Sequence, residues 1–259
     1  MAGLDARLLQ ARDNAAAVVQ ENAGIVFLAI PDQAVSTYSE TLRETVKATG
    51  TAFVHLSGAL PLGALDALRS CGAAVGSFHP LQSFAAAREP DAFRGIMIAV
   101  DASDDALAQR LEQIATALGA RARRVTDEQR PLYHAAAVMA SNYLVALAAE
   151  SMEALEAAGW SSSEAIDDVL PLMAGTLANL GRSESAAEAL TGPIRRGDAA
   201  TVERNLAALD AESPDAASAY RILGLAALRI AQAAGLTDEA AAEIRMALTR
   251  DEQRPGGAM

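Results

Sequence analysis

The sequence predicts an α/β domain built on a largely parallel sheet, followed by an all-helical domain. Up to about residue 126, short apolar runs alternate with helical patterns, and this alternation is typical of parallel sheets covered by helices. After residue 126 no segment has the pattern of a strand. Hydrophobic residues make up 51% of the chain and aromatic residues 4%, which is typical of a helix-rich protein with ample core material. We therefore expect domains at residues 1–126 and 127–250 and a disordered tail at residues 251–259.

Each element of the first domain is expected from a local pattern. Apolar runs predict strands at residues 25–30, 52–56, 73–78, 96–100 and 121–125. Helical patterns lie between them at residues 34–47, 62–69 and 104–118. Because a crossover helix returns the chain to the same end of the sheet, this order favours parallel strands.

The second domain is expected to contain only helices. Helical patterns cover residues 127–158, 162–180, 198–210, 214–235 and 237–249, separated by glycines and prolines such as Gly159 and Pro214. Thr126 and Gln129 fit a capping box that opens the long helix. Pro131 removes one early hydrogen bond, however, and would allow a start beyond it.

Charge and cysteine content narrow the function classes. A net charge of −12 argues against a nucleic-acid footprint and against binding to an anionic membrane surface. Cys71 is the one cysteine, so no disulfide framework is expected and a reducing cytoplasm is the natural location. Charged residues within the first 20 positions interrupt the apolar core that a signal peptide needs. No run approaches the roughly 20 apolar residues of a membrane span. We expect a soluble, cytoplasmic protein.

Polar side chains interrupt an apolar helix at residues 132–143. At 100° per residue, His134 and Ser141 fall within about 40° of each other, and Asn142 lies about 80° from His134. This side of the helix is interpreted as a pocket wall. The alternative is a core histidine satisfied by a backbone carbonyl, with an asparagine packed against a turn.

Three expected strands end in polar loops. Pro31 and Asp32 follow the first strand, Ser57 and Gly58 the second, and the segment from His79 to Gln82 the third. In open α/β sheets, ligands lie beyond the carboxyl ends of the strands, so these loops are expected to border one crevice. Ordinary turn chemistry accounts for each loop separately, and that interpretation remains open.

Other enzyme classes have little support in the sequence. The three histidines, His55, His79 and His134, lack the H-x-x-x-H spacing of a metal site, so no metal is predicted. No G-x-S-x-G motif surrounds Ser57, and the chain has no G-x-x-x-x-G-K phosphate loop.

Five segments together resemble a known family. "VFLAIPDQAV", "FVHLSGAL", "SFHPLQSF", "LYHAAAVMASNYLVAL" and "LTGPIRRGDAATVERNL" look like the 6-phosphogluconate dehydrogenase-like oxidoreductases in which a Rossmann-like domain precedes a helical domain of unknown function 2520. The resemblance covers residues 13–234. It implies an NAD(P)-binding domain and a helical domain that completes the active site and usually forms a dimer. Some relatives are ketopantoate reductases, and more distant ones reduce pyrroline carboxylate or oxidise hydroxy acids.

The resemblance implies roles for particular residues. The family commonly has a lysine at the position of Arg130, and arginine is a poor proton donor, so Arg130 is expected to hold a carboxylate. His134 then becomes the candidate acid, with His79 as its rival, and Asn142 is expected to orient the substrate oxygen. The site is expected to be lined by Ser57, Gly58, His79, Gln82, Ser141, Thr191 and Gly192 for the substrate, and by Ile30, Pro31 and Asp32 for the cofactor.

One departure from the family concerns the cofactor. Such enzymes open with a G-x-G-x-x-G turn that binds the pyrophosphate, and here no two glycines are separated by one residue. The chain begins after the point where the family's first strand, first helix and second strand should be. We therefore expect an N-terminally incomplete Rossmann-like sheet, and a truncated chain is the simplest explanation. NADP or NAD binding is therefore expected to be impaired.

These observations define two function hypotheses. The first is NAD(P)-dependent reduction of a small carbonyl or imine, such as a ketopantoate-like 2-keto acid, by a homodimer that associates through its alanine-rich helices at residues 198–249. The alternative is a non-catalytic helical dimerisation or ligand-sensing module that has lost its cofactor.

Overall fold

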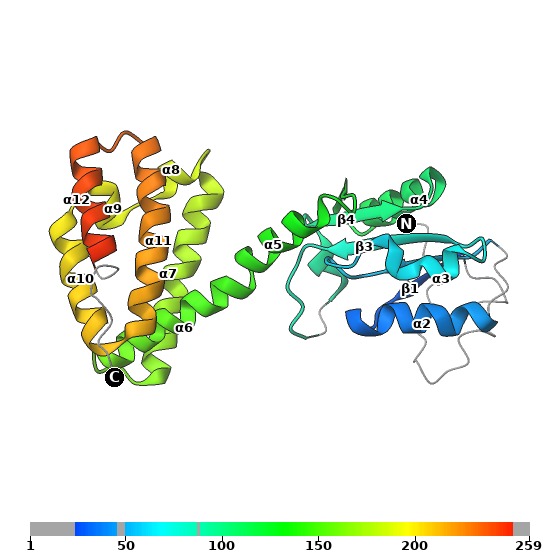
Figure 1. The fold of residues 1–259 in the computed structure, drawn as a ribbon, viewed down its shortest axis with the longest axis horizontal. Coiled ribbons are helices and arrows are strands. Elements are labelled where there is room, and N and C mark those ends of the chain that lie inside the picture. The colour runs from blue at the N-terminus through cyan, green and yellow to red at the C-terminus, as the bar shows by residue number, and fades with distance from the viewer. Residues whose placement is uncertain (1–23, 46–49, 87–88, 251–259) are drawn as a thin grey trace. The chain divides into compact units, whose positions relative to one another are not determined.

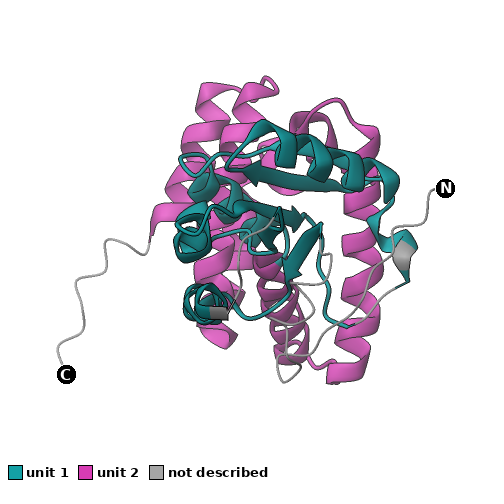
Figure 2. Ribbon diagram, turned by 90° about the vertical axis from the view of Figure 1, so that its right-hand side faces the viewer, with its two compact units in different colours: residues 1–141 teal, residues 142–259 magenta. Residues whose placement is uncertain are grey.

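The computed structural model describes residues 24–45, 50–86 and 89–250. The expected disordered tail and the first 20 positions lie outside these ranges. The chain forms two compact units that divide between Ser141 and Asn142 (Figure 2). The first unit therefore extends past the expected boundary at residue 126 and includes the beginning of the long helical segment.

The first unit is built on a mostly parallel five-stranded sheet. Its strands follow in chain order: β1 (Ile25–Leu28), β2 (Ala52–His55), β3 (Ala74–Pro80), β4 (Met97–Ala102) and β5 (Arg121–Arg124). Neighbouring strands are parallel except β3 and β4, which are antiparallel. The described part of the connection between these two contains only the short helix η2 (Pro90–Phe93), and an antiparallel neighbour needs no crossover helix. The predicted α/β class is thus confirmed, with one strand reversed.

Helices cover both faces of the sheet (Figure 1). On one face, α2 (Asp32–Thr45), η1 (Leu62–Leu65) and α3 (Asp66–Arg69) bury a core that includes Leu28, Phe53 and Val75. On the other face, α4 (Asp105–Ala117) packs through residues such as Leu107 and Leu111. Alternate residues of the central strands are buried in opposite cores, and this explains why the sequence shows continuous apolar runs there.

The long helix predicted at residues 127–158 forms two helices instead of one. Helix α5 (Arg130–Ala140) starts with Pro131 in its first turn, after a turn in which the Thr126 N–H donates to Gln129 Oε1 at 3.1 Å. Ser141, with φ −119° and ψ −73°, separates α5 from α6 (Asn142–Ala157). The expectation of an unbroken helix is therefore wrong at Ser141, and the angle of about 80° between His134 and Asn142, which assumed one regular helix, does not apply.

One segment meets the length and composition of a membrane span, contrary to expectation. Within residues Arg130–Ala157, one window of 18 residues has a mean hydropathy of 1.3, and none of that window is buried within the described protein. Positions 131–149 contain no Asp, Glu, Lys or Arg. Small and apolar residues surround His134, Ser141 and Asn142 in this stretch. One such segment is weak evidence of a membrane span, since core helices of water-soluble proteins pass the same test.

The second unit contains only helices in its described residues. After α6 come α7 (Ser162–Arg182), α8 (Ala186–Ala189), α9 (Gly192–Arg196), α10 (Ala199–Glu212), α11 (Pro214–Ala233) and α12 (Asp238–Thr249). A capping box of Ser161 and Glu164 opens α7. The core lies among α9 to α12 and includes Val202, Leu228 and Ile244. The short helices α8 and α9 were not expected, because they contain only 4 and 5 residues.

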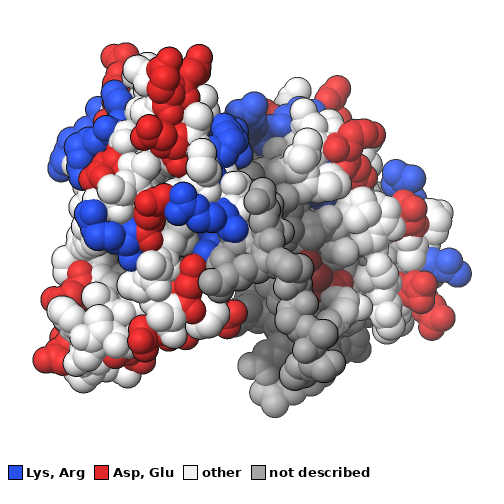
Figure 3. All heavy atoms as spheres, turned by 60° about the vertical axis from the view of Figure 1, so that its left-hand side comes forward, with Lys and Arg blue, Asp and Glu red and all other residues white. Residues whose placement is uncertain are grey.

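The surface of the second unit combines interspersed charges with exposed apolar side chains. On the face shown in Figure 3, acidic and basic atoms alternate. Helix α6 has no buried residue, and α7 exposes Ile166, Leu170, Leu177 and Leu180. At 100° per residue, these four side chains lie within about 80° of one another and form one stripe, which we call the α7 stripe.

Candidate active site

A row of polar residues crosses the first unit at the carboxyl end of β2. His55 of β2 pairs with Ser77 of β3, and Ser77 pairs with Asp101 of β4. Residues paired in this way project from the same face of a sheet. His55 and Ser77 are fully buried, and apart from an interaction with the backbone of Pro61 the ring nitrogens of His55 have no hydrogen-bond partner among the described residues. Burial, followed by the positive charge of Arg130, lowers the pKa of His55 to about 4.

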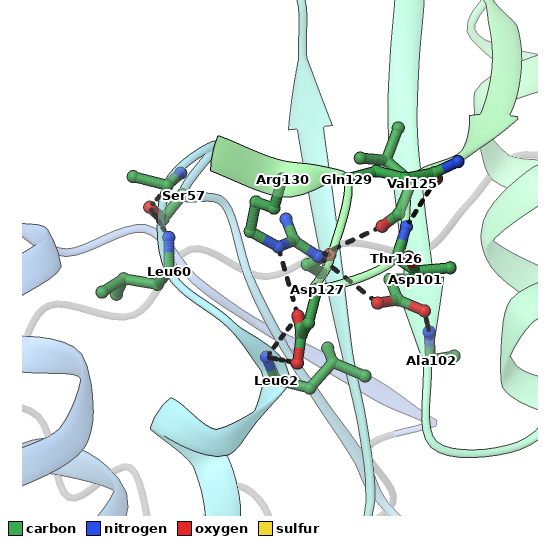
Figure 4. Close-up of polar contacts among 12 residues, drawn as sticks. Ser57, Leu60, Leu62, Asp101, Ala102, Val125, Thr126, Asp127, Gln129 and Arg130 are labelled. Carbon is green, nitrogen blue, oxygen red and sulfur yellow. Dashed lines mark hydrogen bonds and ion pairs between the residues drawn. The ribbon is translucent and has the colours of Figure 1, made fainter. Parts of the chain in front are cut away.

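The guanidinium of Arg130 points toward Asp127, Val125 and Asp101 (Figure 4). Its Nη2 donates to Ser77 Oγ at 2.9 Å and to the Val125 carbonyl oxygen at 3.4 Å, and it lies 3.5 Å from Asp101 Oδ2. Its Nε lies 3.3 Å from Asp127 Oδ1. The Arg130 side chain is 2% exposed, and its Nη1 is buried without a partner among the described residues. Arg130 therefore connects α5 to β3, to β4 and to Val125, the residue that follows β5, from inside the unit.

Asp127 extends this network to the loop after β2. Its two carboxylate oxygens accept from the Leu62 N–H at 3.1 and 3.2 Å, so the turn before α5 is fixed to the start of η1 (Figure 4). The expected contact between Arg130 and a substrate carboxylate would require this network to rearrange. The Asp101 carboxyl has its pKa raised, chiefly by burial.

The first turn of α5 brings two ring side chains to the end of β3. Tyr133 Oη lies 2.6 Å from His79 Nδ1, with the two rings edge to face at 5.6 Å. The ring of His134 lies 6.4 Å from the ring of His79. Burial, then the neighbouring His134 and Arg130, lowers the pKa of His79 to about 4, and burial raises the pKa of Tyr133 to about 12. Both His79 and Tyr133 are therefore neutral at neutral pH.

The loops after β1 and β2 meet beside His79. Ser57 Oγ donates to Asp32 Oδ2 at 2.6 Å and accepts from the N–H groups of Ala59 and Leu60 at 3.1 and 3.0 Å. Gly58 packs against the imidazole of His79, because a Cβ at this position would lie 2.7 to 2.9 Å from three ring atoms. The first unit thus brings together polar groups from the ends of its three parallel strands.

The remaining expected site residues are distributed over both units. In the first unit, Ile30 and Pro31 lie at the start of α2, Gln82 is exposed with its Oε1 accepting from the Ser83 N–H, and Ser141 ends α5. In the second unit, Asn142 begins α6, Thr191 caps α9, and Gly192 has φ +89°. No group of three or more His, Cys, Asp or Glu that could hold a metal is found in the described ranges.

Sequence reasoning missed four residues of this arrangement. Tyr133 belongs to the polar helix, and its place one turn after Arg130 is the signal that points to it. The spacing of Asp127 and Arg130 on a helix start is itself a signal for an ion pair. Ser77 and Asp101 gave no signal, because their alignment with Arg130 depends on strand register.

The described residues do not fit the pyrophosphate of the cofactor that the family resemblance implies. Helix α2 starts at Asp32, and the N-cap of α4 is Asp104, whose Oδ1 accepts from the Leu107 N–H. Carboxylates at these helix N-termini disfavour a bound anion. No G-x-G sequence precedes a helix in the described ranges. We therefore assign no chemical step to contacts with the cofactor's phosphates.

The fold and the site define a class of protein. Its members have a Rossmann-like sheet whose strand ends carry a cluster of histidine and tyrosine side chains, followed by a helical domain. Residues 96–227, just over half of the chain, match a family model described as "Domain of unknown function (DUF2520)". The chain belongs to this family. Among curated proteins, none matches the chain.

Several solved structures share this fold. A "putative NADP oxidoreductase" from Bacteroides fragilis is 26% identical, with a TM-score of 0.65 over 82% of this chain and 78% of its own. A Thermotoga maritima protein is also 26% identical, with a TM-score of 0.65 over 83% of this chain and 81% of its own. Plasmodium falciparum pyrroline carboxylate reductase with NADP bound is 11% identical, with a TM-score of 0.52 over 85% and 77%, which shows the fold alone.

Proposed function

We propose that this chain is an NAD(P)-dependent oxidoreductase that reduces a small carbonyl or imine substrate. The observation that carries the proposal is the contact between His79 and the α5 residues Tyr133 and His134 at the carboxyl end of β3. Ligands of open α/β sheets bind beyond these strand ends. The description of the Bacteroides fragilis structure as an NADP oxidoreductase supports the same class.

In this proposal the protein supplies the proton and orients the substrate. A nicotinamide cofactor would supply the hydride to the carbonyl or imine carbon, and the substrate oxygen or nitrogen takes up a proton. His134 donates that proton, because the lowered pKa of His79, about 4, leaves His79 uncharged at neutral pH. Asn142 would orient the substrate oxygen, and residues 30–32 would be the ones that contact the cofactor.

A non-catalytic ligand-sensing module is the second candidate. One observation favours it: the carboxylates at the N-termini of α2 and α4 leave the described residues without a pyrophosphate site. The two candidates differ in cofactor binding and turnover, and both retain the polar cluster at the strand ends.

The proposal includes assembly and location. We propose a cytoplasmic homodimer, without nucleic-acid or membrane partners, because Cys71 is a free thiol and the net charge is −12. Soluble monomers rarely expose a large contiguous apolar patch, and the α7 stripe together with the unburied α6 forms such a surface. This surface supports a dimer contact through α6 and α7, outside the helices at 198–249 that the sequence suggested.

Cofactor titration followed by a turnover assay tests the proposed function. NADPH and NADH are titrated calorimetrically into the full chain, and oxidation of the reduced cofactor is then followed with 2-keto acids and cyclic imines. Binding of either cofactor with substrate-dependent oxidation supports the oxidoreductase. Absence of binding up to millimolar concentration would reject it in favour of the non-catalytic module.

A further inference from the structure

The length of the hydrogen bond between Tyr133 and His79 indicates which of the two groups donates. An N–H donor to oxygen keeps a distance of about 2.7 to 3.2 Å, whereas O–H donors reach about 2.5 Å. The distance of 2.6 Å between Tyr133 Oη and His79 Nδ1 therefore fits a phenol that donates to an unprotonated Nδ1. Neither group is charged at neutral pH, and the hydroxyl has no other partner among the described residues.

This direction fixes the tautomer of His79. A neutral imidazole carries one proton, and if Nδ1 accepts, that proton is on Nε2. Nε2 has no hydrogen-bond partner among the described residues, so its N–H is available to a ligand. Gly58 packs on the ring and restricts its movement. An N–H donor is thus presented at the carboxyl end of β3.

The position of Tyr133 depends on the network below it. Arg130 and Asp127 anchor the first turn of α5 to Ser77 and to the Leu62 N–H. Tyr133 lies three residues after Arg130 on the same helix, and residues at this spacing share one side. The phenol is therefore fixed against β3 by the same contacts that bury Arg130.

We propose that Tyr133 is a positioning residue that holds His79 in the Nε2–H tautomer, so that His79 donates a hydrogen bond to an acceptor oxygen of the substrate. The tautomer follows from geometry in the first unit alone. The substrate contact rests on the proposed function.

Nitrogen NMR of the full chain tests the tautomer without any activity. With ¹⁵N-labelled histidine, the three rings are assigned by removing His55 and His134 one at a time. We expect His79 Nε2 to be protonated and Nδ1 to be unprotonated at pH 7. In Tyr133→Phe, the His79 signals should move toward a mixture of tautomers. Tyr38→Phe is the matched control, because Tyr38 packs in the same unit and its hydroxyl has no hydrogen-bond partner among the described residues.

Two results would overturn the tautomer assignment: a protonated Nδ1 in the native protein, or unchanged His79 signals in Tyr133→Phe. Kinetics test the substrate contact separately. Loss of an oriented hydrogen-bond donor should raise KM roughly tenfold with a smaller change in kcat and an unchanged pH profile. If Tyr133→Phe instead removes the pH dependence of kcat, Tyr133 is the acid and the positioning role is wrong. If no substrate is turned over, the oxidoreductase fails while the NMR result still decides the tautomer.

Discussion

Arg130 Nη2 lies 2.9 Å from Ser77 Oγ, so a helix of the first unit is joined to the central strand of the sheet by a buried guanidinium. The residue that the sequence suggested as a substrate ligand thus has its partners inside the protein. Asp101 and Asp127 balance its charge. Five predictions test the role of Arg130 and of other residues at the site and on the surface.

Replacing Arg130 should destabilise the first unit. Arg130→Met leaves Asp101 without its ion pair and should lower the free energy of unfolding by roughly 3 kcal/mol, as for other buried pairs that lose one member. The control is Arg124→Met, whose side chain is 47% exposed, and the expected loss there is below about 1 kcal/mol. The one tryptophan, Trp160, lies in the second unit, so its fluorescence would not report unfolding of the first unit. Native-state hydrogen exchange of β3 and β4 is therefore the appropriate measurement. Equal effects of the two variants would contradict the role given to Arg130.

Gly58→Ala should displace the ring of His79. The added Cβ would lie within 2.7 to 2.9 Å of the imidazole, and the ring must move. We expect altered His79 chemical shifts and, in an active enzyme, a loss of substrate affinity. Gly63→Ala is the control, because its nearest side-chain atom is 3.6 Å away. Unchanged His79 shifts in Gly58→Ala would show that the ring does not pack on Gly58 in solution.

The buried His55 should make stability depend on pH. Its folded-state pKa of about 4 is below the value of about 6.5 in the unfolded chain. Between these values the unfolded state binds a proton that the folded state does not, so stability should fall as pH decreases from about 6.5 and stay level above it. The full effect is about 3 kcal/mol. Proton NMR should show no His55 titration from pH 8 to pH 5.

His55→Leu tests whether His55 causes this pH dependence of stability. Apart from an interaction with the backbone of Pro61, the ring nitrogens of His55 have no partner among the described residues, so this variant should lose at most about 1 kcal/mol of stability at pH 7. Its stability should change less between pH 7 and pH 5 than that of the native protein. An identical slope in both proteins would assign the pH dependence to other groups.

Charges on the α7 stripe should dissociate the proposed homodimer. Leu170 and Leu177 are each 52% exposed, and the double variant Leu170→Glu with Leu177→Glu should elute and scatter light as a monomer. The control, Ala207→Glu with Ala208→Glu, adds the same charge to exposed positions of α10, within the region first expected to form the contact. If the control dissociates the dimer and the α7 variant does not, the contact lies at residues 198–249.

Removing His134 should affect chemistry more than cofactor binding. In the active enzyme, His134→Ala should reduce kcat by roughly 10²- to 10⁴-fold, as expected for loss of a general acid, with cofactor affinity nearly unchanged. His79→Ala is the comparison: it should raise KM and retain the pH dependence of kcat. Native turnover with an unchanged pH profile in His134→Ala would assign the proton to another group.

Local patterns were sufficient for the order of elements and for part of the site. The alternation of apolar runs and helices predicted the five strands, since short-range periodicity follows from which face of each element is buried. The polar ends of three strands predicted that Asp32, Ser57 and His79 belong near one another, because parallel strands end on the same edge. The antiparallel β4 was not foreseen, because strand direction depends on a connection that has no periodic signal.

The sequence by itself determined the α/β sheet, the helical second unit, and the presence of His134 and His79 in one polar region. Only the tertiary structure decided that Arg130 is buried, that Tyr133 contacts His79, that Ser141 interrupts the long helix, and that α7 exposes an apolar stripe. The physical reason is that these features depend on strand register and on contacts between residues far apart in the chain. Ser77 and Arg130 are separated by 53 positions, and no local pattern contains their distance.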